Sequence, residues 1–591
     1  MVLAHGGGVF FVRDRILVPT DGDTTDRHYS AYTLSGHVAD ANITMRLETV
    51  ESATDRKARS QAAYPFFEPG TRKLILDAAR TARKATMIEL DDADETEAIF
   101  QQIRFYDRII DSGTMGGPLT PAVLEEVGDA LTRPVSGGAA PATTPATSLP
   151  AAYTYFGQFL AHDMSWMKLD TDLVPPAGAD GPAWINGRHG HALSFDTLFG
   201  TLPEGSARTS TWQEVAGGVV GEAIGDDYNE PKFMDLPRVG MGVSRAPDLR
   251  TDTNLALAQM HVLLVRFHQA ATLSLGGDEP TAQRRTRRHL QAVVLTDYLR
   301  ELIPQDIWSD VLTGGRKIVA TDSSSADFSF EIPIEFAAAC MRFGHSMVND
   351  TYRNWIIDFP PGNGVNKIAK IEQLFHYTLS GNGLEQGQLE VHWAQFWRHM
   401  VEHGNADLPD VVTADPIRAA VPPKFENLNA TQFPPDGTVS SGTPSFNLAV
   451  RTLKRGASLR LPTGQEMHKW IADHVNTFGT APLDIAAFLH HRSDRFGALS
   501  SNIAFCERTP LWFYTLAEAE HANTGKLGPV AGRVVMETFH AALEFAQDSI
   551  ISVNTDGETS TDFARELLVG QGPIDEFSLK DVVAVTFGGV D

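Results

Sequence analysis

The sequence predicts a mainly α-helical protein with few short strands. Apolar residues recur at spacings of three and four in several long windows, whereas runs that alternate apolar and polar residues are short. Hydrophobic residues make up 42% and charged residues 21% of the 591-residue chain, as is typical of a globular protein with a substantial core. The sequence contains no internal repeat, phosphate-binding loop or CxxC pair. We therefore expect one large helical unit.

Two early segments mark where that unit begins. Residues 97–111 (EAIFQQIRFYDRIID) have helical spacing and stop at Ser112-Gly113, so they are predicted to form a helix. Residues 136–150 are rich in proline and small residues and are predicted to form a long surface loop inside the same unit. The predicted boundaries are an N-terminal extension over 1–95, a main helical domain over 96–553 and a tail over 554–591.

Two later helices, over 254–273 and 333–348, have one apolar face each and are predicted to pack on the core. The apolar faces consist of Leu257, Met260, Leu264 and Phe267 in the first helix and of Phe336, Cys340, Phe343 and Met347 in the second. Pro333 suits the first turn of its helix. Further helices are predicted over 466–475, around 509–522 and over 529–548.

Charge and cysteine content exclude several classes of protein. The formal net charge of −25 argues against a nucleic-acid partner, because phosphate contacts need clustered Lys and Arg. No run approaches the roughly 18 apolar residues that span a bilayer, and the start has no signal-peptide pattern, so no membrane insertion is expected. The two cysteines, Cys340 and Cys506, suit a reducing compartment, and we predict a cytoplasmic location. The sequence does not indicate an oligomeric state.

Three groups of residues are candidates for chemistry. Gln158 and His162 are four residues apart and share one helix face, where His162 could act as a general acid and base. Arg250 stands just before the helix over 254–273, from which a cation could stabilise negative charge on an oxygen. His345 is a natural axial ligand for haem iron, and Arg342, one turn earlier, suits a haem propionate.

These groups occur together, in this order, in motifs that resemble those of the animal haem peroxidases, in particular the bacterial branch of that peroxidase and cyclooxygenase superfamily. The motifs are GQFLAHD at 157–163, RTDTNL at 250–255 followed by QMHVLLVRFH, RFGHS at 342–346, and RG at 455–456 leading to LPTGQ at 461–465. The resemblance covers about residues 100–550. It implies a single haem-centred helical domain over 96–553 with haem peroxidase-like catalytic function.

The resemblance also implies a role for each site residue. His345 would bind the haem iron, and His162 would move a proton between the oxygens of hydrogen peroxide. Arg250 would stabilise charge as the O–O bond breaks, while Gln158 would hold distal water or a small anion. Arg342 and Arg455 would bind the haem propionates. The protein would reduce hydrogen peroxide through a ferryl haem and oxidise a small-molecule reductant, as in a response to oxidative stress.

The sequence departs from the family pattern where some members form ester links to haem. Those positions hold Ala161 and Thr253, and the position of a sulfonium link holds Asn254, so none can bond to the haem. We therefore expect a non-covalent haem b and doubt halide oxidation.

Two further sites also differ from the family. A family calcium site would use Asp163 with Ser194 and Asp196, and Ser194 replaces an expected Asp, so any Ca²⁺ would bind more weakly. Thr452 replaces an Asn that orients the proximal imidazole, although its hydroxyl could still accept the imidazole proton.

Three other functions remain open. A fatty-acid dioxygenase of the cyclooxygenase type needs a tyrosine three residues before His345, and that position holds Arg342. A tailoring oxidase on the same scaffold would differ only in its substrate pocket, which the sequence does not reveal. A non-catalytic haem-binding sensor has no need for a distal acid-base pair such as Gln158 and His162.

Overall fold

The computed structural model describes residues 109–110, 119–134, 149–165, 192–199, 250–274, 277–319, 332–352, 412–426, 447–457, 459–551 and 577–587, together with scattered positions between them and the backbone of several strands. The predicted loop over 136–150 lies outside the described residues except for Leu149 and Pro150, and Pro150 forms an isolated bridge with Thr413.

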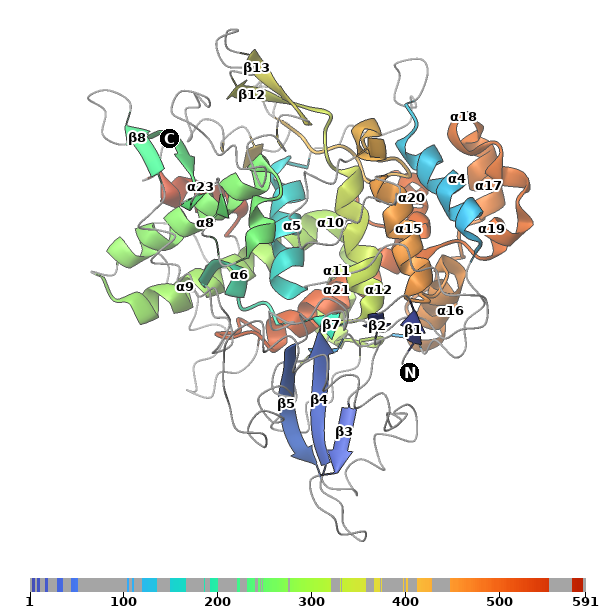
Figure 1. The fold of residues 1–591 in the computed structure, drawn as a ribbon, viewed down its shortest axis with the longest axis horizontal. Helices are drawn as coiled ribbons and strands as arrows, with labels where there is room; N and C mark the ends of the chain where they lie inside the picture. Colours follow the sequence, from blue (N-terminus) through green and yellow to red (C-terminus); the bar gives the residue numbers. More distant parts are fainter. Residues whose placement is uncertain are drawn as a thin grey trace.

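Helices dominate the described part of the chain, and the mainly helical prediction is confirmed (Figure 1). The α-helices are α4 (Pro121–Thr132), α5 (Ala152–Met164), α6 (Asp196–Phe199), α8 (Leu255–Ser274), α9 (Glu279–Ala292), α10 (Leu299–Leu302), α11 (Gln305–Gly314), α12 (Ile334–Ala338), α15 (Leu448–Ser458), α16 (Gly464–His474), α17 (Ile485–His491), α18 (Ser493–Phe496), α19 (Ile503–Glu507), α20 (Leu511–Ala522), α21 (Pro529–Glu544) and α23 (Leu579–Thr586). Short 3-10 helices are η3 (Leu249–Asp252), η5 (Cys340–Ser346), η6 (Pro423–Asn427) and η8 (Leu499–Ser501), and η4 (Val293–Tyr298) is a π-helical turn.

The strands are short and pair in antiparallel fashion. They are β1 (Leu3–His5), β2 (Gly8–Phe10), β3 (Ile16–Pro19), β4 (Tyr29–Ser35), β5 (Thr44–Glu51), β6 (Arg104–Phe105), β7 (Ile185–Asn186), β8 (Val220–Ala223), β9 (Pro231–Asp235), β10 (Arg238–Val239), β11 (Val243–Ser244), β12 (Thr351–Ile357) and β13 (Asn366–Lys370). Strands β3, β4 and β5 form a three-stranded sheet in which β4 is central, and the other sheets have two strands each.

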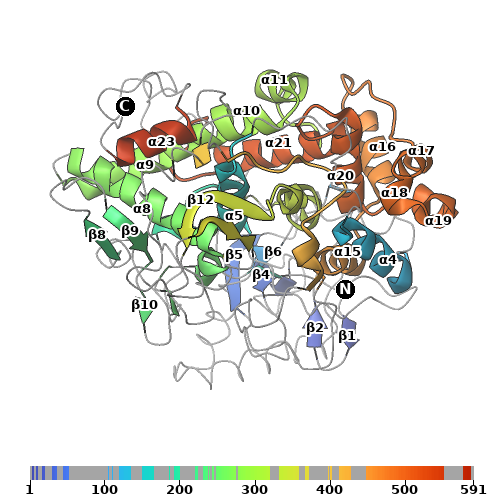
Figure 2. The same ribbon diagram turned by 90° about the horizontal axis from the view of Figure 1, so that it is seen from above.

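Helix α5 lies in the middle of the helical body. Two views place α8, α9 and α23 on one side of it and α4 with α15 to α20 on the other (Figures 1 and 2). The hydroxyl of Thr154 donates to the carbonyl of Met347, 3.3 Å away, and so joins α5 to the segment that follows η5. The helix that carries His162 therefore packs beside the segment that carries His345.

Both predicted core-facing stripes are confirmed, but the second helix is not continuous. All eight stripe residues are buried. The backbone turns at Ala339, where φ is −134° and ψ is −69°, so α12 ends and the 3-10 helix η5 begins. A 3-10 helix has three residues per turn, so Arg342 and His345 lie on the same face of η5.

The predicted helix over 97–111 is wrong in part. Residues Arg104 and Phe105 form strand β6, which pairs with β7. The backbone N–H groups of Ile109 and Ile110 donate to the buried carboxylate of Glu335, both at 3.2 Å. These segments take their structure from partners that are distant in the chain. The helical spacing of residues 97–111 carries no information about such partners.

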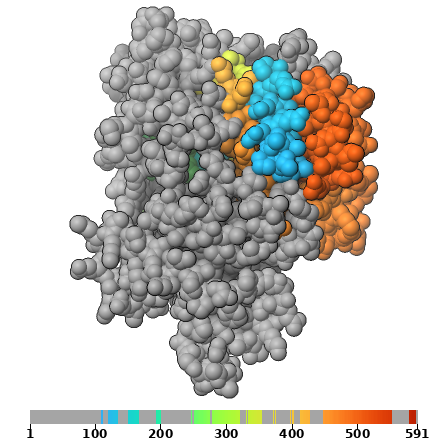
Figure 3. Space-filling view, turned by 45° about the vertical axis from the view of Figure 1, so that its right-hand side comes forward, coloured from blue at the N-terminus to red at the C-terminus, as the bar shows by residue number. Residues whose placement is uncertain are grey.

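Two peripheral helices complete the helical body. Helix α4 lies on the surface beside helices of the C-terminal half (Figure 3), and it packs against α15. Helix α23, from the predicted C-terminal tail, packs against α8 and buries Leu579 and Val582. Among the described residues, no helix combines the length and apolar character needed to cross a bilayer.

Candidate functional site

Gln158 and His162 lie on α5, and both are half-buried. The side-chain amide of Gln158 is held at both ends. Its Nε2 donates to the hydroxyl of Thr253 at 3.4 Å, and its Oε1 accepts from Nδ2 of Asn254 at 3.1 Å. Asn254 also accepts from the backbone N–H of Leu257 and so caps the start of α8. Thr253 and Asn254, two of the positions that cannot form a covalent link to haem, therefore orient Gln158.

Arg250 is turned onto the C-terminal end of α5. Its Nη2 donates to the carbonyl of His162 at 2.7 Å, and its Nη1 donates to the carbonyl of Ser165 at 2.6 Å. The buried carboxylate of Asp248 accepts from the backbone N–H, Nε and Nη2 of Arg250. A cation is favourable at a helix C-terminus, where carbonyl groups lack helical partners.

The expected role of Arg250 in stabilising negative charge stays a prediction, and the structure shows where its guanidinium is held. The guanidinium holds the turn of α5 that carries His162 instead of extending freely from the start of α8. This follows from Asp248, which stands two residues earlier and fixes the orientation of the guanidinium by a salt bridge of 2.5 Å.

His345 lies on η5 with the ring edge-to-face against Trp512 of α20, at a centroid distance of 5.9 Å. Its Nδ1 is enclosed and has no hydrogen-bond partner among the residues that the structure describes. Burial, followed by the nearby positive charges of Arg342 and Arg455, lowers the pKa of His345 to about 3. The imidazole is therefore neutral near pH 7, which is the state that binds a metal ion.

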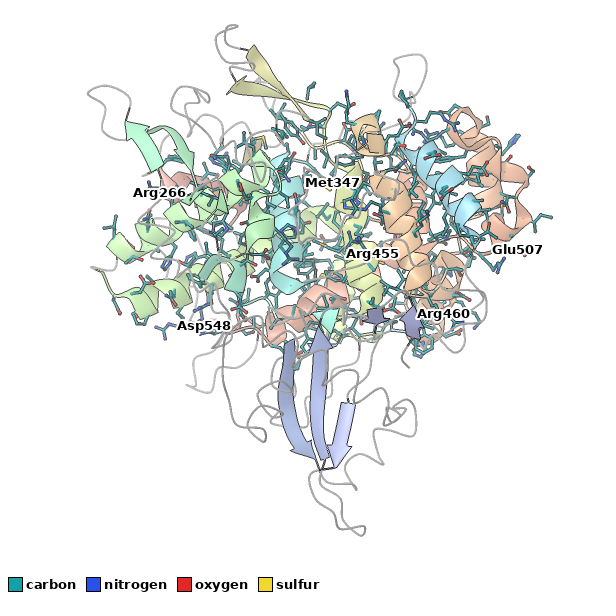
Figure 4. The ribbon with its side chains drawn as sticks, in the orientation of Figure 1. Arg266, Met347, Arg455, Arg460, Glu507 and Asp548 are labelled. Carbon is teal, nitrogen blue, oxygen red and sulfur yellow. The ribbon has the colours of Figure 1, made fainter. Side chains whose placement is uncertain are left out.

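Arg342 and Arg455 come to His345 from different elements. Arg342 precedes it on η5, and Arg455 comes from α15, near the middle of the helical body (Figure 4). The carbonyl of Arg342 accepts from Nε1 of Trp512 at 3.1 Å, which fixes η5 against α20. A neutral imidazole can bind the iron of a haem, and two guanidinium groups can pair with the two propionate carboxylates of the same haem. These residues therefore fit a haem.

The expected bond between Thr452 and His345 is not formed. Thr452 is buried on α15, and its hydroxyl donates to the carbonyl of Leu448 at 2.9 Å, one turn earlier in the same helix. This helical bond satisfies the hydroxyl locally, as is common for threonine inside a helix.

The residues expected to bind calcium lie together but are engaged by protein groups. The two carboxylate oxygens of Asp163 accept from the backbone N–H groups of Phe195 and Thr197, both at 2.9 Å. The hydroxyl of Ser194 accepts from the backbone N–H of Gln547 at 3.0 Å. Asp196 begins α6 and is half-buried. In the described parts of the chain, no cluster of three or more acidic, His or Cys side chains could hold a metal ion.

Three residues of this region were not predicted from the sequence. Asp248 has a local signal, because it stands two residues before Arg250. Trp512 has none, because 170 residues separate it from the carbonyl of Arg342 to which it donates. His261 is fully buried on α8 against Phe159, and its position could be read only as part of a helix core.

Residues 229–405 match the model of the family described as animal haem peroxidase. The peroxidasin homologue pxn-1 of Caenorhabditis elegans is 24% identical over 237 residues, which cover 38% of this chain and 16% of that protein. The match thus spans about one sixth of the length of this curated relative.

Two solved structures share the fold. Peroxidase A of Dictyostelium discoideum has a TM-score of 0.51 at 14% identity, over 83% of this chain and 95% of that chain. A fatty acid alpha-dioxygenase of Oryza sativa has a TM-score of 0.52 at 15% identity, over 82% of this chain and 81% of that chain. At such low identity these similarities show the fold alone.

Proposed function

We propose that this chain, which matches the animal haem peroxidase family model over residues 229–405, is a haem-dependent peroxidase that reduces hydrogen peroxide and oxidises a small organic reductant. The observation that supports the proposal most is His345, a half-buried neutral imidazole whose enclosed Nδ1 has no hydrogen-bond partner among the described residues and which lies beside two arginines. When bound, haem would supply the electron transfer between peroxide and reductant.

The residues around the proposed haem have distinct tasks. His345 would bind the iron, while Arg342 and Arg455 would pair with the propionates and so fix the orientation of the ring. We propose a non-covalent haem b, because Thr253 and Asn254 are engaged in holding Gln158 and neither is a carboxylate.

His162 would move the proton on the peroxide side. Its imidazole would accept the proton of hydrogen peroxide and return it to the departing oxygen, which leaves as water. Arg250 would act as a positioning residue, since it holds the carbonyl of His162 and so fixes the last turn of α5. Gln158, fixed by Thr253 and Asn254, would orient water or peroxide near His162.

A fatty-acid dioxygenase is a second candidate, supported by one observation beyond the shared fold. Tyr352 follows His345 in the chain, is fully buried, and forms a hydrogen bond of 2.5 Å with Tyr155 of α5. Burial raises the pKa of Tyr352. A protonated, enclosed phenol beside the proximal segment is the kind of group from which a hydrogen-abstracting radical can form. Oxygen uptake with a long-chain fatty acid and without peroxide would favour this candidate.

The test compares haem-loaded wild type with His345→Ala, His162→Ala and His491→Ala. His491 is exposed on α17 and serves as the control. Wild type and His491→Ala should bind one haem per chain, released intact by acid and solvent, and should react rapidly with hydrogen peroxide. His345→Ala should lose the haem absorption band. His162→Ala should keep it but react with peroxide roughly 10²–10⁴-fold more slowly, the usual contribution of a general acid-base group.

Two outcomes would overturn the proposal. Unchanged haem binding by His345→Ala would remove its structural basis. Haem-loaded wild type that does not react with peroxide would exclude the peroxidase and leave the dioxygenase or a sensor.

A further inference from the structure

The loop over 192–199 is built against the C-terminal end of α5. Asp163, directly after His162, is 1% exposed and accepts two backbone N–H groups of this loop. Phe195 has a φ of 57°, which is unfavourable for a residue with a side chain. The hydrogen bond from its N–H to Asp163 holds it there.

A guanidinium group occupies the other side of this loop. Arg287 of α9 is 3% exposed, and its Nε donates to the carbonyl of Ser194 at 3.2 Å. Its Nη1 lies 3.2 Å from Oδ2 of Asp548, and its guanidinium carbon lies 4.4 Å from the ring centroid of Phe199. Asp548, labelled in Figure 4, follows α21. One side chain therefore joins the loop, α9 and the segment after α21.

Negative charge surrounds this guanidinium. Burial lowers the pKa of Arg287, and the carboxylates of Asp548, Asp196 and Asp163 oppose that shift. A buried arginine is stable only where opposite charge and hydrogen-bond acceptors compensate for its lost hydration. Together with the carbonyl of Ser194, the three carboxylates supply that compensation.

The same groups do not fit a calcium ion. Calcium takes six to eight oxygen ligands. Both oxygens of Asp163 accept N–H groups, and the carbonyl of Ser194 is bound by Arg287. A divalent ion placed among these acceptors would also face the buried positive charge of Arg287. Both carboxylate oxygens of Asp163 and the carbonyl of Ser194 are therefore already bound by protein donors, and the nearest cation site is taken by Arg287.

We propose that Arg287 is a built-in cation that replaces a bound calcium ion at the end of α5. Its charge pairs with Asp548 and partly offsets the charges of Asp163 and Asp196, it ties the 192–199 loop to α9, and so it fixes the turn that carries His162 without a metal ion. The chain consequently needs no calcium for its folded structure. This inference does not depend on the activity proposed above.

The experiment measures the thermal unfolding of the purified full-length protein. Wild type is compared in EDTA and in about 10 mM calcium chloride, a concentration roughly tenfold above the Kd of even weak protein sites. Arg287→Met removes the charge but retains an unbranched side chain. Arg284→Met is the matched control, because Arg284 lies on the same helix and forms no hydrogen bond or ion pair with the described residues.

Wild type should have the same Tm in EDTA and in calcium, and titration calorimetry with calcium chloride should show no binding. Arg287→Met should lower Tm by about 3–6 °C, because it leaves buried carboxylates without their cation. Arg284→Met should leave Tm nearly unchanged. Amide hydrogen exchange should rise in residues 161–165 and 192–199 of Arg287→Met only.

The proposal fails if calcium raises the Tm of wild type, or if Arg287→Met behaves like Arg284→Met. If Arg287→Met does not fold, Arg287→Lys replaces it. Lysine keeps the charge but cannot contact Ser194 and Asp548 with a planar fork, so a smaller loss of Tm is expected. A Tm equal to that of wild type for Arg287→Lys, together with calcium binding by wild type, would overturn the proposal.

Discussion

Two histidines in the middle of the molecule are held neutral by burial. Burial lowers the pKa of His345 to about 3 and that of His261 to about 4. They differ in surroundings, because His345 has two arginines nearby and His261 has the carboxylate of Asp248, which opposes the shift. Both ring nitrogens of His261 lack hydrogen-bond partners among the described residues. The charges next to each imidazole therefore distinguish His345, the proposed iron ligand, from His261, a buried histidine of the core.

His261 should make the protein less stable in acid. Its folded pKa of about 4 lies below the unfolded value of about 6.5, so between these values the unfolded state binds more protons. Stability should therefore fall as the pH drops from 6.5 to 4, by on the order of 3 kcal/mol at most from this residue. His261→Leu removes the proton uptake and two unsatisfied nitrogens.

Urea unfolding of His261→Leu at several pH values tests this prediction. The variant should be as stable as wild type or more stable at pH 7, because replacing an unsatisfied polar group by an apolar one is often favourable. Its stability should depend less on pH between 6.5 and 4. An unchanged pH dependence would mean that His261 is protonated in the folded protein or accessible to water.

At the scale of elements, close contacts between helices set the positions of site residues. Helix α4 packs on α15, which carries Arg455, and Gly128 lies at the contact. A Cβ atom at Gly128 would lie 2.7 Å from the backbone nitrogen of Val450 and 2.8 Å from its Cα. Asn447 caps α15 and also donates to Asp129 of α4 at 3.1 Å. The absence of a side chain at Gly128 therefore allows α15 its present position.

Gly128→Ala should destabilise the protein by about 1–3 kcal/mol, because backbone atoms of Val450 cannot yield as a side chain would. It should also weaken haem binding, since α15 carries Arg455. Gly456→Ala is the control on α15, where the new Cβ would have an ordinary contact of 3.5 Å with Leu461. That control should be neutral or stabilising by up to about 1 kcal/mol. Equal stability of the two variants in denaturant titration would refute the close contact.

For the whole molecule, the predicted domain boundaries remain predictions, and the C-terminal one is open to a direct test. The predicted tail over 554–591 contains α23, which buries Leu579 and Val582 against the helical body. The backbone N–H of Leu579 donates to Asp297 at 2.8 Å, and the ring of Phe577 contacts that of His289. These contacts join the tail to α8, α9 and η4.

A chain that ends at residue 576 should therefore lose several kcal/mol of stability, since burial of each large apolar side chain contributes roughly 1.5–3 kcal/mol. A chain that ends at residue 587 keeps α23 and is the control. Thermal unfolding of both should show a lower Tm for the shorter chain alone. Equal Tm values would show that residues 577–587 are a dispensable tail.

The sequence by itself determined the helical class, the core-facing stripes and the common helix of Gln158 and His162, because period and motif are local properties of the chain. It could not determine which distant partner each side chain meets. The carbonyl groups at the end of α5 capture Arg250, the helix around Leu448 satisfies Thr452, and Glu335 holds Ile109 and Ile110.

The tertiary structure also decided the charge balance at Asp163. Arg287 is 124 residues away in the chain, and only folding brings its guanidinium to the 192–199 loop. An exposed carboxylate can be stabilised by water, whereas a buried carboxylate needs a protein partner. Burial therefore makes the positive charge of Arg287 necessary. Sequence motifs thus indicated where a cation belongs, and long-range packing decided that the protein supplies its own.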